Sequence, residues 1–166
     1  MKPLIKGKKR IILAGMDFFG NPFEKAGGWS EQNEIGRLWH RFMSFYKKRK
    51  EEIIGLVSEG GYELWIDLDV EKDPKDKYIF VGVEVEKIDV LPLELIVRVL
   101  PETRYALFTL KGGEIKSDWS DLLFEKWLPE SGLKKSFDFL IEYYDDQRFK
   151  GMEDPNSELD LYVPIK

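Results

Sequence analysis

The sequence predicts an α+β protein built on a mainly antiparallel sheet. Apolar and β-branched runs of strand length recur along the chain, helical spacing is confined to two segments, and most links between strands are of hairpin length. The chain has 166 residues, of which 43% are apolar and 14% aromatic. It is therefore long enough to form one domain, residues 1–166, with a substantial core.

The first half is expected to contain a strand, a helix, a hairpin and a further strand. Residues 10–16 (RIILAGM) form a short apolar run that predicts a buried strand, and the turn-rich residues 18–28 follow it. From Ser30 onward apolar side chains recur at steps of three and four, which predicts an amphipathic helix. These side chains are Ile35, Leu38, Trp39, Phe42, Met43 and Tyr46. The basic residues 47–50 suit the negative end of its dipole.

Two apolar runs, 53–57 and 62–70, are separated by SEGG, and together they predict a hairpin. Residues 78–88 alternate between apolar and polar side chains. This alternation predicts a half-exposed strand in which Glu84 and Glu86 face the solvent, opposite Val83 and Val85.

The second half is expected to repeat this composition in a similar order. Runs at 93–100 and 104–113 flank a predicted turn at 101–103. A second helix is predicted from the spacing of Trp119, Leu122, Leu123, Lys126 and Trp127, with its end near Pro129 and Gly132. Residues 139–145 and 158–165 are the last two predicted strands.

Charge and composition exclude several classes of function. The net charge is −5, and the two dense basic runs, 6–10 and 47–50, lie beside element ends, so direct binding of nucleic acid is disfavoured. There is no cysteine and only one histidine, His40, so neither a metal site nor a cofactor is expected. Asp67, Asp69 and Asp73 lack the glycine and terminal glutamate of a calcium loop. No apolar run approaches the ~20 residues of a membrane span, and a cytoplasmic protein is expected.

The most informative segment is FLIEYYD, residues 139–145, because a carboxylate stands among apolar and aromatic side chains. In a strand, Glu142 and Tyr144 point to the same face. If that face is solvent, the charge is ordinary. If it is core, the carboxylate needs a partner. If it is a cavity with aromatic walls, the carboxylate suits a lipophilic cation.

The other candidate residues carry similar alternatives. Trp39, Trp119 and Trp127 lie on helical stripes, where they either pack in the core or line a pocket. Glu142 and Tyr144 also form a candidate acid/base pair for an electrophilic substrate. A weak internal repeat favours two similar halves, about 1–88 and 89–166. It matches LWHRF (38–42) with LFEKW (123–127), and Glu63-Leu64-Trp65 with Glu142-Tyr143-Tyr144.

Four pieces of the second half resemble the GyrI-like effector-binding domains of AraC-type and multidrug-responsive MerR-type regulators, which also occur as stand-alone proteins. They are Pro101 with RYALFTLKGG, WLPESG (127–132), the Glu-x-Tyr of residues 142–144, and the closing LYVPI. The first half, with AGMDFFGNPFEKAGGW and EIGRLWHRF, resembles the stand-alone members more loosely.

The resemblance implies duplicated β-α-β-β units, two main helices and a central groove that binds small molecules. It places Glu142 in that groove, in contact with cationic aromatic ligands, with Tyr144 beside it. The further ligand-binding residues expected are Trp39, Trp65, Trp127 and Phe108.

Three functions follow from the resemblance. The leading hypothesis is a stand-alone binding protein that senses or sequesters hydrophobic, cationic aromatic compounds, acting alone or together with a separate regulator. The alternative is a hydrolase of strained electrophilic small molecules, with Glu142 and Tyr144 as catalytic residues. A third hypothesis is an interaction module for a protein such as DNA gyrase, meeting it through an acidic face of Asp67, Asp69, Glu84 and Glu86.

Overall fold

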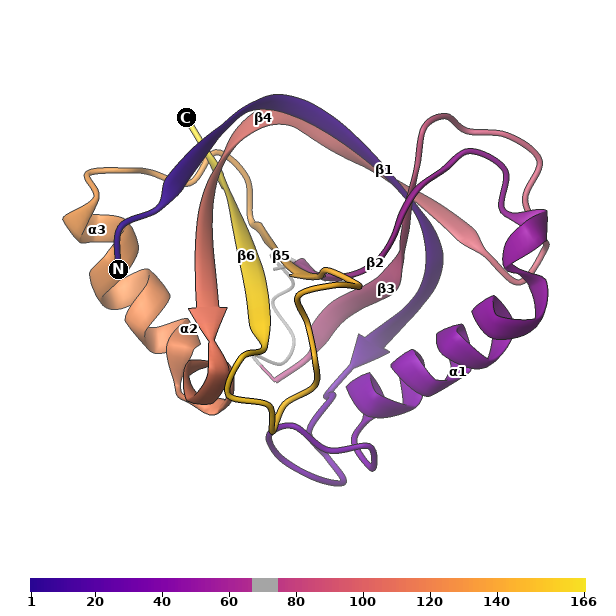
Figure 1. Cartoon of the computed structure of the whole chain (residues 1–166), viewed down its shortest axis with the longest axis horizontal. Coiled ribbons are helices and arrows are strands. Elements are labelled where there is room, and N and C mark those ends of the chain that lie inside the picture. The colour runs from indigo at the N-terminus through magenta and orange to yellow at the C-terminus, as the bar shows by residue number, and fades with distance from the viewer. Residues whose placement is uncertain (67–74) are drawn as a thin grey trace.

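The computed structural model of the chain, which describes residues 1–66 and 75–166, is a closed six-stranded antiparallel barrel with one helical segment on each side (Figure 1). The strand order around the barrel is β1-β3-β2-β5-β6-β4. The strands are β1 (Leu4–Gly20), β2 (Leu56–Ile66), β3 (Lys77–Val85), β4 (Ile96–Lys111), β5 (Phe139–Tyr144) and β6 (Glu158–Ile165). The predicted α+β class with a mainly antiparallel sheet is confirmed.

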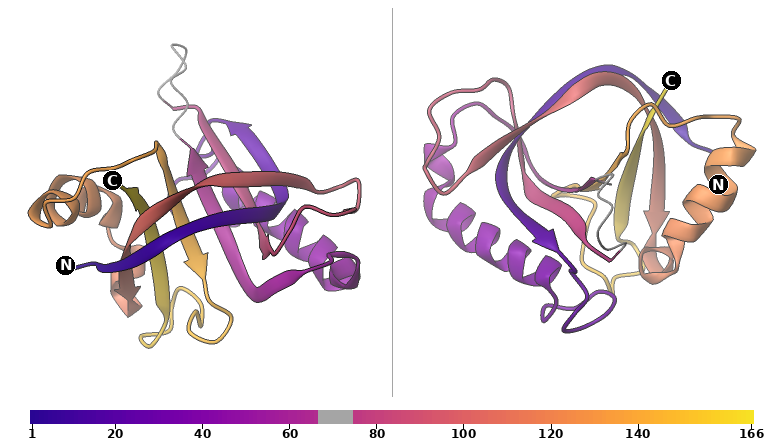
Figure 2. Two further views of the ribbon diagram at one scale, coloured as in Figure 1. Left: turned by 90° about the horizontal axis from the view of Figure 1, so that it is seen from above. Right: turned by 180° about the vertical axis from the view of Figure 1, so that it is seen from behind.

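Each half of the chain follows the order strand, helix, strand, strand. The first half runs β1, α1 (Glu34–Arg49), η1 (Lys50–Glu52), β2, β3. The second runs β4, η2 (Gly112–Lys116), a helical segment of α2 (Trp119–Leu122), η3 (Leu123–Trp127) and α3 (Leu128–Glu130), then β5 and β6. The halves join twice, where β2 pairs with β5 and where β1 pairs with β4. β1 and β4 are long enough to arch over both halves, as Figure 2 shows from above and from behind.

Helix α1 begins at Glu34, a turn later than Ser30, and packs as its apolar spacing predicts. The Asn33 side chain accepts a hydrogen bond from the Gly36 amide at 2.9 Å and caps the N-terminus. Leu38, Phe42 and Tyr46, spaced four residues apart, are buried against the outer face of the first-half strands. Trp39, on the flank of this stripe, lies over Gly61 of β2 and is only half-buried. The apolar stripe of α1 therefore has a buried row and a half-buried flank.

The core has three layers, because both faces of the barrel wall are covered. One cluster lies under α1 and another under the α2–α3 segment. The third fills the barrel interior and includes Leu13, Leu64, Phe80 and Ile141, each fully buried. Gly15 and Gly82 face each other across β1 and β3, and a Cβ on Gly15 would lie 2.0 Å from the Val81 carbonyl oxygen. These strands can therefore approach so closely only with glycine at that position.

The predicted hairpin over residues 53–70 is wrong where the structure describes it, up to Ile66. The SEGG segment does not turn the chain, because β2 continues through it. Leu56 pairs with Val85 and Gly61 with Val83, so the residues between them bulge out of the ladder. Residues 67–70, and the aspartates of the rejected calcium motif, lie outside the described residues.

The predicted turn at residues 101–103 is also wrong, because β4 runs without interruption from Ile96 to Lys111. Proline cannot donate to a strand ladder, which is why the sequence suggests a turn at Pro101. The pairing of β1 with β4 shifts register between Lys6 and Ile11, opposite this stretch. The bulge accommodates the missing donor.

Glu84 is buried, which corrects the prediction of a half-exposed strand. Its side chain points into the barrel, accepts a hydrogen bond from the Tyr62 hydroxyl at 2.5 Å and pairs with the Lys9 ammonium at 2.7 Å. The expected acidic face is therefore not formed by Glu84, whereas Glu86, just beyond the end of β3, is exposed. The closed barrel turns the second face of β3 inward, and a flat sheet would have left it in solvent.

Candidate functional site

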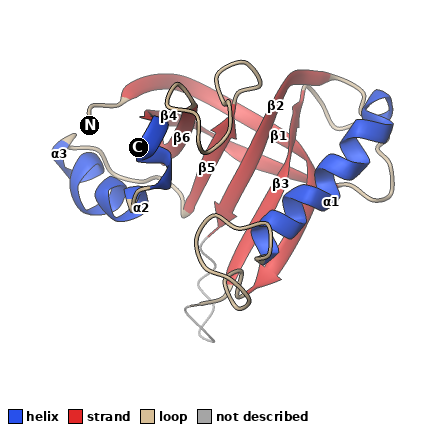
Figure 3. Ribbon diagram, turned by 60° about the horizontal axis from the view of Figure 1, so that its bottom comes forward, coloured by secondary structure: helices blue, strands red, loops and turns tan. Residues whose placement is uncertain are grey.

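A groove of about 1040 Å³ lies over β2 and β5, between α1 and the second helical segment. Figure 3 shows these two strands in the middle of the molecule, with a helical segment on either side. The groove is lined by side chains from both halves and by the loops around residues 23–33 and 146–152. Strand alternation positions the floor: Tyr62 and Leu64 point into the barrel, so Glu63 and Trp65 point outward into the groove.

Glu63 and Glu142 form the centre of the floor. They are paired directly in the antiparallel register of β2 and β5, and their exposures are 1% and 2%. In the described part of the chain, no lysine, arginine or histidine forms an ion pair with either carboxylate. Two acidic groups are thus held side by side in a nearly dry site.

Aromatic donors satisfy these carboxylates. The Trp39 indole donates to one oxygen of Glu63 at 2.5 Å and the Trp65 indole to the other at 2.8 Å. The Tyr144 hydroxyl donates to Glu142 at 2.8 Å. These contacts hold the carboxylates in position but carry no positive charge, so they leave the negative charge uncompensated.

Burial and mutual repulsion raise the pKa values of the pair. Burial raises the pKa of Glu63 to about 6, although hydrogen bonds from Trp39 and Trp65 act in the opposite direction. The pKa of Glu142 is raised well above 4.5, first by burial and then by the neighbouring Glu63 charge. The two carboxyl groups therefore titrate as a coupled pair and hold their protons to higher pH than free glutamates do.

The walls of the groove are aromatic and thioether side chains. Trp39 and Tyr144 meet edge to face with centroids 5.2 Å apart, and Phe23 stacks on Trp65 at 6.3 Å. Other wall residues are Trp29, Phe42, Met43, Trp119, Phe124, Phe139, Phe149 and Met152. Among the residues that the structure describes, the acidic lining residues Glu31, Glu59, Glu63, Asp118, Glu142 and Asp146 outnumber the basic ones, Lys77 and Lys135. Flat hydrocarbon surfaces with an excess of negative charge favour an aromatic cation.

The structure gathers four of the six expected ligand-binding residues, Glu142, Tyr144, Trp39 and Trp65, around the floor. It places the other two elsewhere. Phe108 and Trp127 stack on each other at 6.1 Å in the core under the second helical segment, and neither lines the groove. Trp127 faces the sheet because it continues the buried stripe of Trp119 and Leu123, and there it meets Phe108 of β4.

Glu63 was missed as a site residue, although the sequence carried a signal for it. The repeat that matches Glu63-Leu64-Trp65 with Glu142-Tyr143-Tyr144 makes Glu63 the counterpart of Glu142. The same repeat aligns Trp39 with Phe124, and both line the groove. Residues Phe149 and Met152 had no such signal, because they lie on a loop.

A barrel of two β-α-β-β halves with an aromatic, acidic groove defines a small-molecule-binding domain. The family of the integron-associated effector-binding protein Cass2 matches residues 4–165, and the chain belongs to that family. The resemblance to GyrI-like effector-binding domains is thereby confirmed. None of the helices in the described part of the chain has the length and apolar character needed to cross a membrane.

One sequence relative and two solved structures are informative. The transcriptional regulator BrlR of Pseudomonas aeruginosa is 31% identical over 168 residues, which cover 99% of this chain and 56% of BrlR. The chain thus spans about half the length of that relative. The structure of SAV2435 bound to tetraphenylphosphonium has a TM-score of 0.63 and 12% identity, with coverage of 100% and 94%. A hydrolase from Listeria innocua has a TM-score of 0.56 and 12% identity, with coverage of 99% and 92%. These two structures share the fold.

Proposed function

We propose that this chain binds bulky aromatic cations in the groove, with Glu63 and Glu142 as the countercharge, and so senses or sequesters such compounds. The observation that carries the proposal is the pair of buried carboxylates with no cationic partner in the described chain, enclosed by Trp39, Trp65 and Tyr144. A buried charge without a protein counterion is costly, and a ligand cation removes that cost.

The volume of the groove and the family of the chain support the same proposal. A volume of about 1040 Å³ lies at the upper end of the range for small-molecule pockets and admits a ligand with several rings. The chain belongs to an effector-binding family, and a protein of the same fold binds tetraphenylphosphonium. Tetraphenylphosphonium is therefore the probe of choice, because it combines one positive charge with four aromatic rings.

The test is a calorimetric titration with tetraphenylphosphonium, followed in parallel by tryptophan fluorescence. We expect the parent to bind, and Glu63→Gln or Glu142→Gln to weaken binding by about 10- to 100-fold, the usual loss for a desolvated charge-assisted contact. Glu86→Gln is the matched control, since Glu86 is exposed and outside the groove. Neutral triphenylphosphine oxide should be insensitive to all three changes. The proposal fails if the parent does not bind, or if both groove variants bind as the parent does.

One observation supports the hypothesis of an enzyme. Glu142, whose pKa is raised by burial and by the neighbouring Glu63 charge, lies beside Glu63, and two adjacent carboxyl groups with perturbed pKa values are an arrangement that acid/base hydrolysis uses. We infer a second candidate function in which Glu142 and Tyr144 act on a strained electrophile bound in the groove. Mass spectrometry of the compound after incubation separates the two functions, because a binding protein returns its ligand unchanged.

A further inference from the structure

One wall of the groove is formed by the segment between β5 and β6. Phe149, Gly151 and Met152 line the groove from this segment. The Phe149 ring meets Tyr144 edge to face, with centroids 4.8 Å apart and planes at 90°. Because Tyr144 donates its hydroxyl hydrogen to Glu142, Phe149 also supports the position of the donor at the floor.

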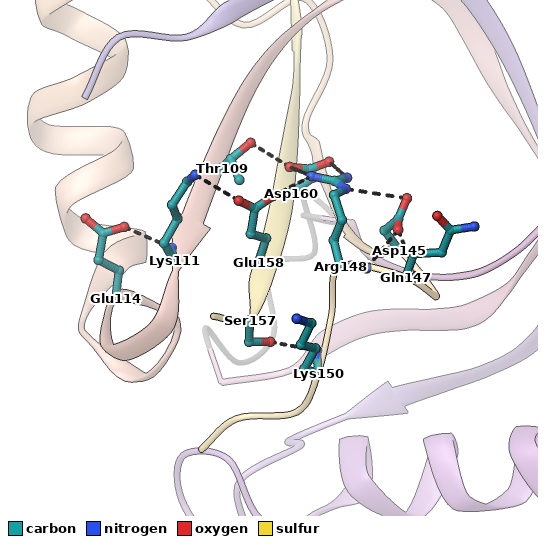
Figure 4. Close-up of polar contacts among 10 residues, drawn as sticks. All are labelled: Thr109, Lys111, Glu114, Asp145, Gln147, Arg148, Lys150, Ser157, Glu158 and Asp160. Atoms are coloured by element: carbon teal, nitrogen blue, oxygen red, sulfur yellow. Dashed lines mark hydrogen bonds and ion pairs between the residues drawn. The ribbon is translucent and has the colours of Figure 1, made fainter. Parts of the chain in front are cut away.

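Arg148, the neighbour of Phe149, points the other way and connects the segment to the barrel (Figure 4). Its guanidinium donates to Glu158 at 3.0 Å and also to both oxygens of Asp160. The Nε atom lies 3.6 Å from an oxygen of Asp145, at the start of the segment. One side chain thus joins the wall segment to two residues of β6.

The barrel end of this connection is buried and hydrogen-bonded within the sheet. Asp160 is 3% exposed, lies within the strand β6 and accepts a further hydrogen bond from Thr109 of β4 at 2.6 Å. The backbone adds to the attachment, since the Glu158 amide donates to the Arg148 carbonyl at 3.0 Å. Arg148 therefore transmits the position of the barrel strand to the wall of the groove.

We propose that Arg148 is a positioning residue for ligand binding: by holding Phe149 and Met152 against the groove it sets the affinity for bulky aromatic cations. This inference rests on the proposed function of the same groove. The physical reason is preorganisation, because side chains that are already ordered lose less entropy when a ligand packs on them. Arg148 itself does not line the groove, so it acts through the wall.

The test variant is Arg148→Met combined with Asp160→Asn, which removes the ion pair without leaving a buried charge unpaired. Lys111→Met is the matched control. It removes a more exposed ion pair, from Lys111 to Glu158 at 2.8 Å, and keeps Arg148 and its partners Glu158 and Asp160; Lys111 belongs to β4 and does not line the groove. Phe149→Ala and the combination of Phe149→Ala with the test variant complete a thermodynamic cycle.

Two measurements are made on each protein. In the ligand-free state, amide hydrogen exchange of residues 146–152 should quicken in the test variant and stay unchanged in the Lys111→Met control. For tetraphenylphosphonium, Kd should rise about tenfold in the test variant, as expected for two side chains that must be ordered on binding. On the Phe149→Ala background the same change should have a smaller effect than in the parent, because only Met152 is then left for Arg148 to hold.

The inference is overturned if exchange of the segment is unaltered, if Lys111→Met weakens binding equally, or if the losses in the cycle are additive. If the parent binds no tetraphenylphosphonium, the proposed function fails and Arg148's effect on affinity fails with it. In that case the exchange measurement still decides whether Arg148 holds the wall in place.

Discussion

Glu63 and Glu142 stand directly opposite each other on β2 and β5, one from each half of the chain. The register of this strand pair runs from Gly61 against Tyr144 to Ile66 against Phe139, so the two Glu-x-aromatic motifs run antiparallel past each other. Each half supplies one carboxylate and one aromatic donor two residues later. The duplication thereby places two acids within one groove, where either half alone would supply one.

Binding of a cation should release a proton. Burial and the charge of Glu63 raise the pKa of Glu142, and a bound cation would favour its ionised form. We expect binding of tetraphenylphosphonium to release protons from the pair, measured by calorimetry in buffers of different ionisation enthalpy. Glu142→Gln should bind without this release. A parent titration whose heat is independent of the buffer would contradict the prediction.

The same pair should make the protein less stable as pH rises. Both folded-state pKa values lie above the ordinary 4.5, so the folded protein holds protons that the unfolded chain gives up. The resulting stabilisation is fully present below about pH 4.5 and is lost as pH rises through about 6 and above. For Glu63 the difference between 4.5 and about 6 corresponds to on the order of 2 kcal/mol.

This pH effect is measured by urea unfolding of the parent and Glu142→Gln at several values between about pH 5 and 8. The variant cannot ionise at that position, so its stability should fall less and exceed that of the parent at the upper end. Glu86→Gln should follow the parent. If the free energy of unfolding changes with pH in the same way for the parent and for Glu142→Gln, Glu142 does not titrate in this range.

Gly61 should be required for the position of Trp39. A Cβ at Gly61 would lie 2.7 Å from Cη2 of the Trp39 indole, so Gly61→Ala must displace the ring that donates to Glu63. We expect a shift in tryptophan emission and about tenfold weaker binding of tetraphenylphosphonium, as for loss of one such hydrogen bond. Gly113→Ala is the control, because nothing lies within 4 Å of its added Cβ. Unchanged emission in Gly61→Ala would refute this role.

Tyr62 and Glu84 should contribute to stability and not to binding. Their hydrogen bond of 2.5 Å lies inside the barrel, on the side of β2 opposite the groove. Tyr62→Phe removes the donor to a buried carboxylate and should lower the free energy of unfolding by about 1–3 kcal/mol, measured with urea. Its affinity for tetraphenylphosphonium should match that of the parent. Loss of binding without loss of stability would contradict the separation of the two layers.

Sequence patterns predicted the elements in which no turn-forming residue interrupts the run of apolar side chains. The stripe of Leu38, Phe42 and Tyr46 predicted α1, and the strand predicted at residues 158–165 is β6 with the same bounds. The predictions failed at Gly60-Gly61 and at Pro101, where turn-forming residues stand within long strands. Their reasons are tertiary: Trp39 packs over Gly61, and a bulge in the pairing with β1 accommodates Pro101.

The sequence by itself determined the α+β class, the common strand face of Glu142 and Tyr144, and the family resemblance. Only the tertiary structure decided that Glu63 meets Glu142, that Glu84 is buried, and that Trp127 packs in the core while Phe149 reaches the groove. The physical reason is that the periodicity of a strand or helix fixes which side chains share one of its faces. What lies opposite that face depends on strand register and barrel closure, which bring together residues about eighty positions apart in the chain.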